Sequence, residues 1–177
     1  MVFGEATALL AGDALLTLAF DAVCGCDGLS AENKVKAVRL LSKKAGVRGM
    51  IGGQQLDLSG EKERLSRETH LKMNMLKTGA LIRAAALLGC IAADADEKTF
   101  EAADEYAKNI GLAFQVTDDL LDDGEEDEKT TFLTFMSREQ AQKYADELTE
   151  NAVKVLCDIK NSETLTDLAY FLAKRDV

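Results

Sequence analysis

The sequence contains no proline, and its apolar residues recur at spacings of three and four rather than alternating. Proline interrupts helices because it lacks a backbone donor and clashes with the preceding turn, so its absence permits long helices. Spacings of three and four place apolar side chains on one helix face. The sequence therefore predicts an all-α fold. We expect helices over residues 3–23, 31–45, 47–58, 66–92, 97–123, 138–159 and 163–174.

Short polar segments separate the expected helices. Ser30, Ser66 and either Asn161 or Ser162 stand where a helix N-cap is expected, because their side chains can accept a hydrogen bond from the first turn. The sequence shows no internal repeat, low-complexity tract or linker. We therefore expect residues 1–177 to form part of a single domain.

Charge and cysteine content narrow the classes of function. The net charge is −10, and the Lys and Arg residues are scattered, which argues against a protein that binds the phosphate backbone of a nucleic acid. The four cysteines form no CxxC pair and have no histidine at a spacing suited to zinc. They are expected to be reduced thiols of a cytoplasmic protein.

Residues 6–23 are apolar on most faces and are long enough to resemble a membrane span. Asp13, however, lies in the middle of this segment, and a carboxylate at the centre of a bilayer is costly. A helix that is apolar all round is equally expected in the core of a helical protein. We therefore predict a buried core helix and no membrane span.

Residues 111–123, GLAFQVTDDLLDD, place four aspartates at the end of an otherwise apolar helix. Gln115, Asp118 and Asp122 follow one strip of this helix, and Asp119 lies beside them. Like charges at this spacing repel, and they also oppose the helix dipole. A bound Mg²⁺ shared with a substrate phosphate would offset both effects. A solvated acidic helix end is the alternative that the spacing leaves open.

Lys77 falls within the apolar stripe of the helix expected over 66–92, where an unpaired ammonium group would be expensive. Its side chain either extends to solvent or directs its charge into a polar cavity that holds an anion. An inward lysine on one helix and carboxylates on another are what a metal-bridged diphosphate requires.

Five blocks of this sequence, in order, resemble the trans-type polyprenyl (isoprenyl) diphosphate synthases, which include farnesyl and geranylgeranyl diphosphate synthases. The resemblance implies an all-α antiparallel helix bundle of the isoprenoid synthase type around a deep cavity, and a homodimer. It also implies Mg²⁺-dependent condensation of isopentenyl diphosphate with an allylic diphosphate. The blocks are FGEATALLAGDALLTLAF (3–20), GMIGGQQLDL (49–58), KTGALI (77–82), GLAFQVTDDLLDD (111–123) and YFLAKRD (170–176).

The resemblance also implies roles for individual residues. Asp118, Asp119 and Asp122 match the second aspartate-rich motif of the family and would hold Mg²⁺ on the allylic diphosphate, either directly or through water. No side chain is assigned a nucleophilic or acid–base role. The residues that match substrate-binding positions are Lys77, Thr78, Gln115 and Lys129, and those that match a supporting block are Gln54 and Asp57.

The sequence lacks the family's first aspartate-rich motif, the arginine pair that follows it and the upstream GGKRxRP segment. We therefore expect the C-terminal half of a synthase, with apolar surface exposed that a complete chain would cover. The alternatives are a non-catalytic half subunit, or prenyl-diphosphate-binding partner, of a complete synthase, and a helical remnant without function. The blocks favour farnesyl-type enzymes but do not determine product length.

Two further features receive structural interpretations. His70 has no Ser, Asp or Cys partner at a suggestive position, so we expect it at the surface or near a helix cap. The glycines of residues 46–53 do not follow a strand, so we expect them to allow close helix contacts rather than to bind phosphate.

Overall fold

A computed structural model describes residues 2–61, 63–122 and 130–174. These residues form eight α-helices and one short 3₁₀ helix, and no strand occurs among them, so the all-α prediction is confirmed. The elements are α1 (Glu5–Gly25), α2 (Ala31–Ala45), α3 (Met50–Gly60), α4 (Arg67–Lys77), α5 (Gly79–Ala92), α6 (Glu97–Leu121), η1 (Phe132–Thr134), α7 (Arg138–Lys154) and α8 (Glu163–Ala173).

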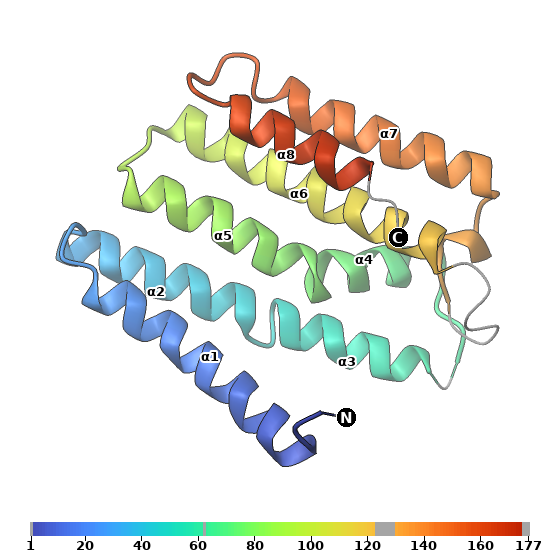
Figure 1. Cartoon of the computed structure of the whole chain (residues 1–177), viewed down its shortest axis with the longest axis horizontal. Helices are drawn as coiled ribbons and strands as arrows, with labels where there is room; N and C mark the ends of the chain where they lie inside the picture. The colour runs from blue at the N-terminus through green and yellow to red at the C-terminus, as the bar shows by residue number, and fades with distance from the viewer. Residues whose placement is uncertain (1, 62, 123–129, 175–177) are drawn as a thin grey trace.

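The chain runs back and forth across the molecule, so that successive layers of helices are antiparallel (Figure 1). The long helix α6 lies between α5 on one side and α7 on the other. Helix α2 packs against α5, and α1 forms the edge beside α2. Helix α3 packs mainly against α4.

Helix α6 is buried along most of its length because it has neighbours on two sides. Its C-terminal half packs with η1 and α7 in one apolar cluster, and its N-terminal half packs with α7 and α8 in a second. The buried members of the first cluster are Leu112, Ala113, Val116, Leu120, Phe132, Ala141, Ala145 and Leu148. Those of the second are Tyr106, Ala107, Ile110, Ala152, Leu156 and Ala169.

The single helix expected over 66–92 is divided at Thr78, where α4 and α5 meet at an angle of 41°. Gly79 follows the break and lies directly against α6: a Cβ built on Gly111 would be 3.1 Å from the Cα of Gly79. Glycine–polar pairs are common sites of helix bends. The apolar periodicity continues through the break, which is why the pattern predicted one helix.

The N-caps of α2 and α4 are confirmed. The Ser30 side chain accepts a hydrogen bond from the Asn33 backbone, and the Ser66 side chain accepts one from the Thr69 backbone. Ser162 occupies the N-cap position of α8, but its side chain makes no cap hydrogen bond. The helix expected over 138–159 ends at Lys154 and continues as turns.

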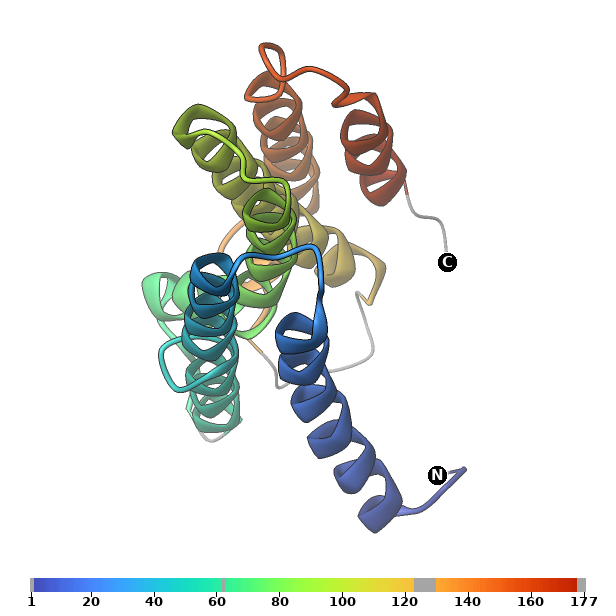
Figure 2. The same cartoon turned by 90° about the vertical axis from the view of Figure 1, so that its left-hand side faces the viewer.

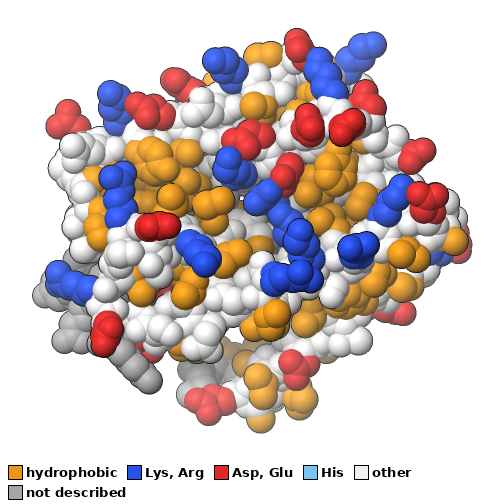
Figure 3. Space-filling model, turned by 180° about the vertical axis from the view of Figure 1, so that it is seen from behind, with side chains coloured by type: hydrophobic (Ala, Val, Ile, Leu, Met, Phe, Trp, Pro, Cys, Tyr) orange, Lys and Arg blue, Asp and Glu red, His pale blue; other side chains and the backbone are white. Residues whose placement is uncertain are grey.

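The prediction that residues 6–23 form a buried helix is wrong. Helix α1 has no buried residue, and Leu9, Leu10 and Leu15 are each at least 65% exposed. One neighbour cannot cover a helix that is apolar on all sides, and α1 diverges from α2 toward its N-terminus (Figure 2). Further apolar side chains lie between charged ones on the face shown in Figure 3.

By length and composition alone, α1 could cross a membrane, with a mean hydropathy of 1.6. Helices α4 and α5, counted as one bent segment, meet the same criteria. Core helices of soluble proteins also have these properties, so the observation does not assign a location to either segment.

Candidate active site

The acidic residues at the end of α6 face in two directions. Asp118 is half-buried and accepts a hydrogen bond from the Gln115 side chain, with 3.0 Å between Nε2 and Oδ2. Asp122 follows the last residue of α6 and is exposed, on the same side as Asp118 by spacing. Asp119 instead accepts a 2.7 Å hydrogen bond from the Phe132 backbone. Consecutive helix residues point about 100° apart, which explains the divergence.

Among the described residues, no three His, Cys, Asp or Glu side chains are gathered closely enough to hold a metal ion. The roles of Asp118, Asp119 and Asp122 as Mg²⁺ ligands therefore stay predictions, and they do not form a ready-made three-carboxylate centre. The residues still fit the ion, because Mg²⁺ is commonly held by one or two carboxylates together with substrate phosphates and waters.

An arginine that the sequence did not single out contacts the same end of α6. The Arg138 guanidinium donates a 2.7 Å hydrogen bond to the Leu120 carbonyl oxygen. A cation at a helix C-terminus interacts favourably with the dipole and satisfies a carbonyl left free there. Arg138 therefore offsets part of the electrostatic cost of the acidic helix end, which the sequence led us to expect a bound metal ion to offset.

Lys77 ends α4, and its charge is paired inside the chain. The Lys77 ammonium lies 2.5 Å from Oδ2 of Asp57 on α3, with the lysine side chain 33% exposed and the aspartate 12% exposed. Gln54 donates to the same carboxylate at 3.3 Å. Asp57 therefore contacts both Gln54 and the predicted diphosphate-binding lysine, while the supporting role of Gln54 and Asp57 stays a prediction.

Gly53 makes this pairing possible. A Cβ built on Gly53 would lie 2.1 Å from the Lys77 backbone nitrogen, so α3 and α4 approach more closely than any side chain would allow. Gln54 and Asp57 follow Gly53 on α3 and are thereby brought beside the end of α4. The expectation that glycines in this region allow close helix contacts is confirmed at Gly53.

The remaining predicted substrate-binding residues lie in different settings. Thr78 is the partly buried residue at the bend between α4 and α5, and its backbone donates to the Asn74 carbonyl. Lys129 lies outside the described residues. The next residue, Thr130, is buried and its hydroxyl accepts a hydrogen bond from the Leu65 backbone at 3.2 Å.

His70 was expected at the surface or near a helix cap. The surface position is wrong, because the residue is 2% exposed. It does lie near a cap, since its backbone N–H donates to the carbonyl of Ser66, the N-cap of α4. It packs against Phe132 because η1 returns over α4 after the acidic end of α6, a long-range contact that helix periodicity does not reveal. Burial lowers the pKa of His70, although the Thr130 backbone and Asp57 favour the protonated ring. The ring is therefore neutral near pH 7.

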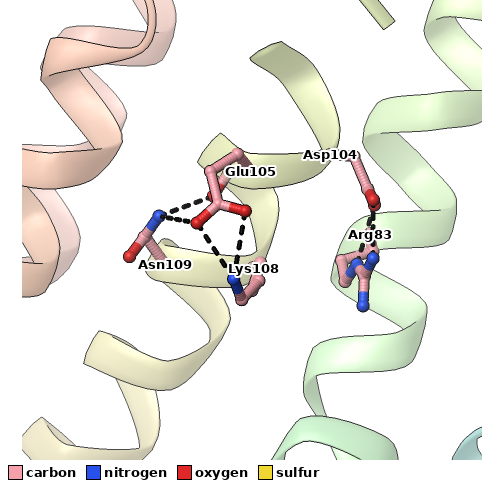
Figure 4. Close-up of polar contacts among 5 residues, drawn as sticks. All are labelled: Arg83, Asp104, Glu105, Lys108 and Asn109. Atoms are coloured by element: carbon pink, nitrogen blue, oxygen red, sulfur yellow. Dashed lines mark hydrogen bonds and ion pairs between the residues drawn. The ribbon is translucent and has the colours of Figure 1, made fainter. Parts of the chain in front are cut away.

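An ion pair joins α5 to α6 away from the acidic motif (Figure 4). Arg83 donates to both carboxylate oxygens of Asp104, at 2.7 and 2.6 Å. The arginine lowers the pKa of Asp104 chiefly through these hydrogen bonds. One turn along α6, Lys108 and Asn109 both contact Glu105. Of these contacts, only the Arg83–Asp104 pair joins α6 to α5, whereas those of Glu105 lie within α6.

Comparison with known proteins identifies the class. The chain is 36% identical to farnesyl diphosphate synthase of Escherichia coli, over 98% of this chain and 65% of that protein. A solved FPP/GFPP synthase from Zymomonas mobilis superimposes with a TM-score of 0.87 at 32% identity, over 97% of this chain and 62% of that one. The architecture is thus the helical fold of the isoprenoid synthases.

The profile of the polyprenyl synthetase family matches residues 1–132, and the chain belongs to this family. A geranyltransferase from Helicobacter pylori, solved with magnesium and isoprenyl diphosphate, has a TM-score of 0.79 at 29% identity, over 97% of this chain and 60% of that one. The chain spans about 65% of the length of its E. coli relative. Their alignment extends over 194 positions, more than this chain contains, so the relative has internal residues with no counterpart here.

Proposed function

We propose that this chain supplies the allylic-diphosphate half of a Mg²⁺-dependent prenyltransferase site, which condenses isopentenyl diphosphate with an allylic diphosphate in isoprenoid biosynthesis. The observation that carries the proposal is the 36% sequence identity between this chain and farnesyl diphosphate synthase of E. coli, which extends over 98% of this chain. The half-buried Asp118 at the end of the central helix and the lysine at the end of α4 agree with it.

In this reaction the diphosphate leaves the allylic substrate with the bonding electrons, the isopentenyl double bond attacks the allylic cation, and loss of a proton restores an alkene. Mg²⁺ would neutralise the charge that grows on the departing diphosphate. Asp118 and Asp122 would hold the ion from one side of α6, and the Gln115 amide keeps the Asp118 carboxylate oriented. Asp119, whose carboxylate diverges from these two, would contact the ion through water.

Lys77 would contact the same diphosphate. A lysine ammonium has three donors, and the hydrogen bond to Asp57 uses one of them. The others remain for phosphate oxygens, so Asp57 holds the ammonium in place rather than competing for it. Thr78 and Lys129 are proposed as further diphosphate contacts on the basis of the family resemblance. The homodimeric state and the cytoplasmic location also stay proposals.

A second candidate is a non-catalytic half subunit that binds prenyl diphosphates and associates with a complete synthase. The observation that favours it is the uncovered apolar surface of α1, which no helix other than α2 contacts extensively among the described residues. In this case the diphosphate-binding residues keep their roles, but condensation requires residues of the partner.

One experiment separates the two. The chain is incubated with Mg²⁺, geranyl diphosphate and labelled isopentenyl diphosphate, and the extracted prenyl products are counted, while calorimetry measures geranyl diphosphate binding. Product formation supports the synthase. Mg²⁺-dependent binding without product fits a half site in either candidate, and co-purification of the chain with a complete synthase then supports the half subunit. Absence of both binding and product contradicts both candidates.

A further inference from the structure

His70 lies where α4 meets the segment that follows the acidic motif. Its ring centroid is 4.8 Å from that of Phe132 at an interplanar angle of 74°, an edge-to-face contact. Phe135 lies on the same ring, with 5.8 Å between centroids. The histidine therefore packs against two aromatic residues of the η1 segment, each contact within the usual range for aromatic pairs.

Phe132 connects this ring to the acidic end of α6. It is 4% exposed, and its backbone N–H donates a 2.7 Å hydrogen bond to Oδ2 of Asp119. Phe132 thus contacts His70 through its side chain and Asp119 through its backbone. This donor helps to hold the Asp119 carboxylate in its observed direction, so that direction depends in part on where Phe132 is held.

Asn74 fixes the orientation of the histidine. Its side-chain nitrogen lies 3.2 Å from Nε2 of His70, one turn along α4. The backbone carbonyl of Asn74 also accepts a hydrogen bond from the backbone N–H of Thr78, the residue after Lys77. One short helix therefore carries both the predicted diphosphate-binding lysine and the ring that packs on Phe132.

The contacts of His70 indicate which property of the side chain matters. Nδ1 makes no hydrogen bond of standard geometry among the described residues, although the Thr130 backbone lies near enough to favour the protonated ring, so the ring uses only part of its polar capacity. Two aromatic neighbours, Phe132 and Phe135, lie against the ring. An aromatic replacement should therefore preserve its contribution better than a small or aliphatic one.

We propose that His70 is a positioning residue of the diphosphate site, which holds Phe132 in place and thereby directs the Asp119 carboxylate at the end of α6. The role rests on the proposed function, in which Asp119 helps to hold Mg²⁺ on the diphosphate. His70 itself touches neither ion nor substrate. Its effect reaches the site through one packed ring and one backbone hydrogen bond.

The test uses His70→Ala, His70→Leu, His70→Phe, Asp119→Asn and the double variant of His70→Ala with Asp119→Asn. Hydrogen exchange of the Phe132 amide reports on the contact directly, with the Gln140 amide, which bonds to the Ser137 side chain, as the internal reference. The Mg²⁺ concentration that gives half-maximal binding of inorganic diphosphate reports on the site.

Exchange of the Phe132 amide, relative to that of Gln140, should be about tenfold faster in the His70→Ala, His70→Leu and Asp119→Asn variants, and close to wild type in His70→Phe. The half-maximal Mg²⁺ concentration should rise about fivefold or more in His70→Ala and His70→Leu. In the Asp119→Asn background, His70→Ala should add little, because residues that act through one another are not additive.

Unchanged Phe132 exchange in His70→Leu would overturn the proposal, as would independent, multiplicative effects of His70→Ala and Asp119→Asn on Mg²⁺ dependence. The leucine variant retains an apolar side chain, so it serves even if the alanine variant does not fold. If Asp119→Asn itself left the Mg²⁺ dependence unchanged, the metal role in the proposed function would be contradicted, and with it the role of His70.

Discussion

The Lys77 ammonium lies 2.5 Å from the Asp57 carboxylate, across the contact between α3 and α4. This pair accounts for a lysine at the end of a largely apolar helix face: its charge is neither unpaired nor fully solvated. The pairing also orients the ammonium before any diphosphate arrives, which lowers the entropic cost of binding.

Replacing Lys77 by methionine should weaken Mg²⁺-dependent binding of geranyl diphosphate about 10- to 100-fold, because a hydrogen bond to a charged group contributes about 1.5–3 kcal/mol. Isothermal titration calorimetry measures the effect. Lys98→Met is the matched control, since Lys98 pairs with Asp158 at an exposed site. Equal affinities of the Lys77 and Lys98 variants for geranyl diphosphate would show that Lys77 does not contribute to diphosphate binding.

Replacing Gly53 by alanine should destabilise the chain by more than about 1–3 kcal/mol, the usual cost of overpacking, because the new methyl group would meet backbone atoms of Lys77 that cannot move aside. The free energy of unfolding in urea measures this. In contrast, Gly89→Ala on α5 meets no atom within 4 Å and should stabilise the helix by about 0.5–1 kcal/mol. Comparable stabilities of the two variants would contradict the close α3–α4 contact.

The sequence predicted the helices and the family because both depend on local signals. Apolar spacing indicated helices, and Ser30 and Ser66 marked two of their starts. The bend at Thr78 was missed because apolar spacing continues through it, and the close approach of Gly79 to Gly111 beside it is a contact between distant parts of the chain that spacing does not reveal. The exposure of α1 was missed for a related reason: composition shows that a helix is apolar but not what covers it.

The residues assigned to the candidate site stay predictions, and the sequence did not reveal how the structure arranges them. Helix spacing placed Asp119 beside the strip of Asp118 and Asp122, whereas in the structure its carboxylate accepts a hydrogen bond from the Phe132 backbone. Helix spacing cannot show that Asp119 bonds to the Phe132 backbone or that Arg138 contacts the helix end, since both partners lie beyond the end of α6 and outside its periodicity. The burial of His70 depends on the same returning segment.

The Arg83–Asp104 pair predicts a pH dependence of stability. The pKa of Asp104 is lowered from its ordinary value of 3.8, so its stabilising contribution is fully present above that pH and is lost as the pH falls through the lower pKa of the folded state. Both side chains are partly exposed, so we expect a contribution of about 1 kcal/mol.

Urea unfolding of the wild type and of Asp104→Asn between pH 7 and pH 3 measures this contribution. The two curves should differ most at pH 7 and converge at the acid end. A difference that stays constant over the whole range would show that the carboxylate charge of Asp104 does not stabilise the fold.

The most direct test of the central claim is the binding of geranyl diphosphate, with and without Mg²⁺, to the wild type and to Asp118→Asn. Asp167→Asn, at an exposed position on α8, is the control for loss of a carboxylate. We predict binding by the wild type and the control that requires Mg²⁺, and a loss of about tenfold or more in Asp118→Asn. Binding that is independent of Mg²⁺, or undiminished in Asp118→Asn, would contradict a metal–diphosphate site at the end of α6.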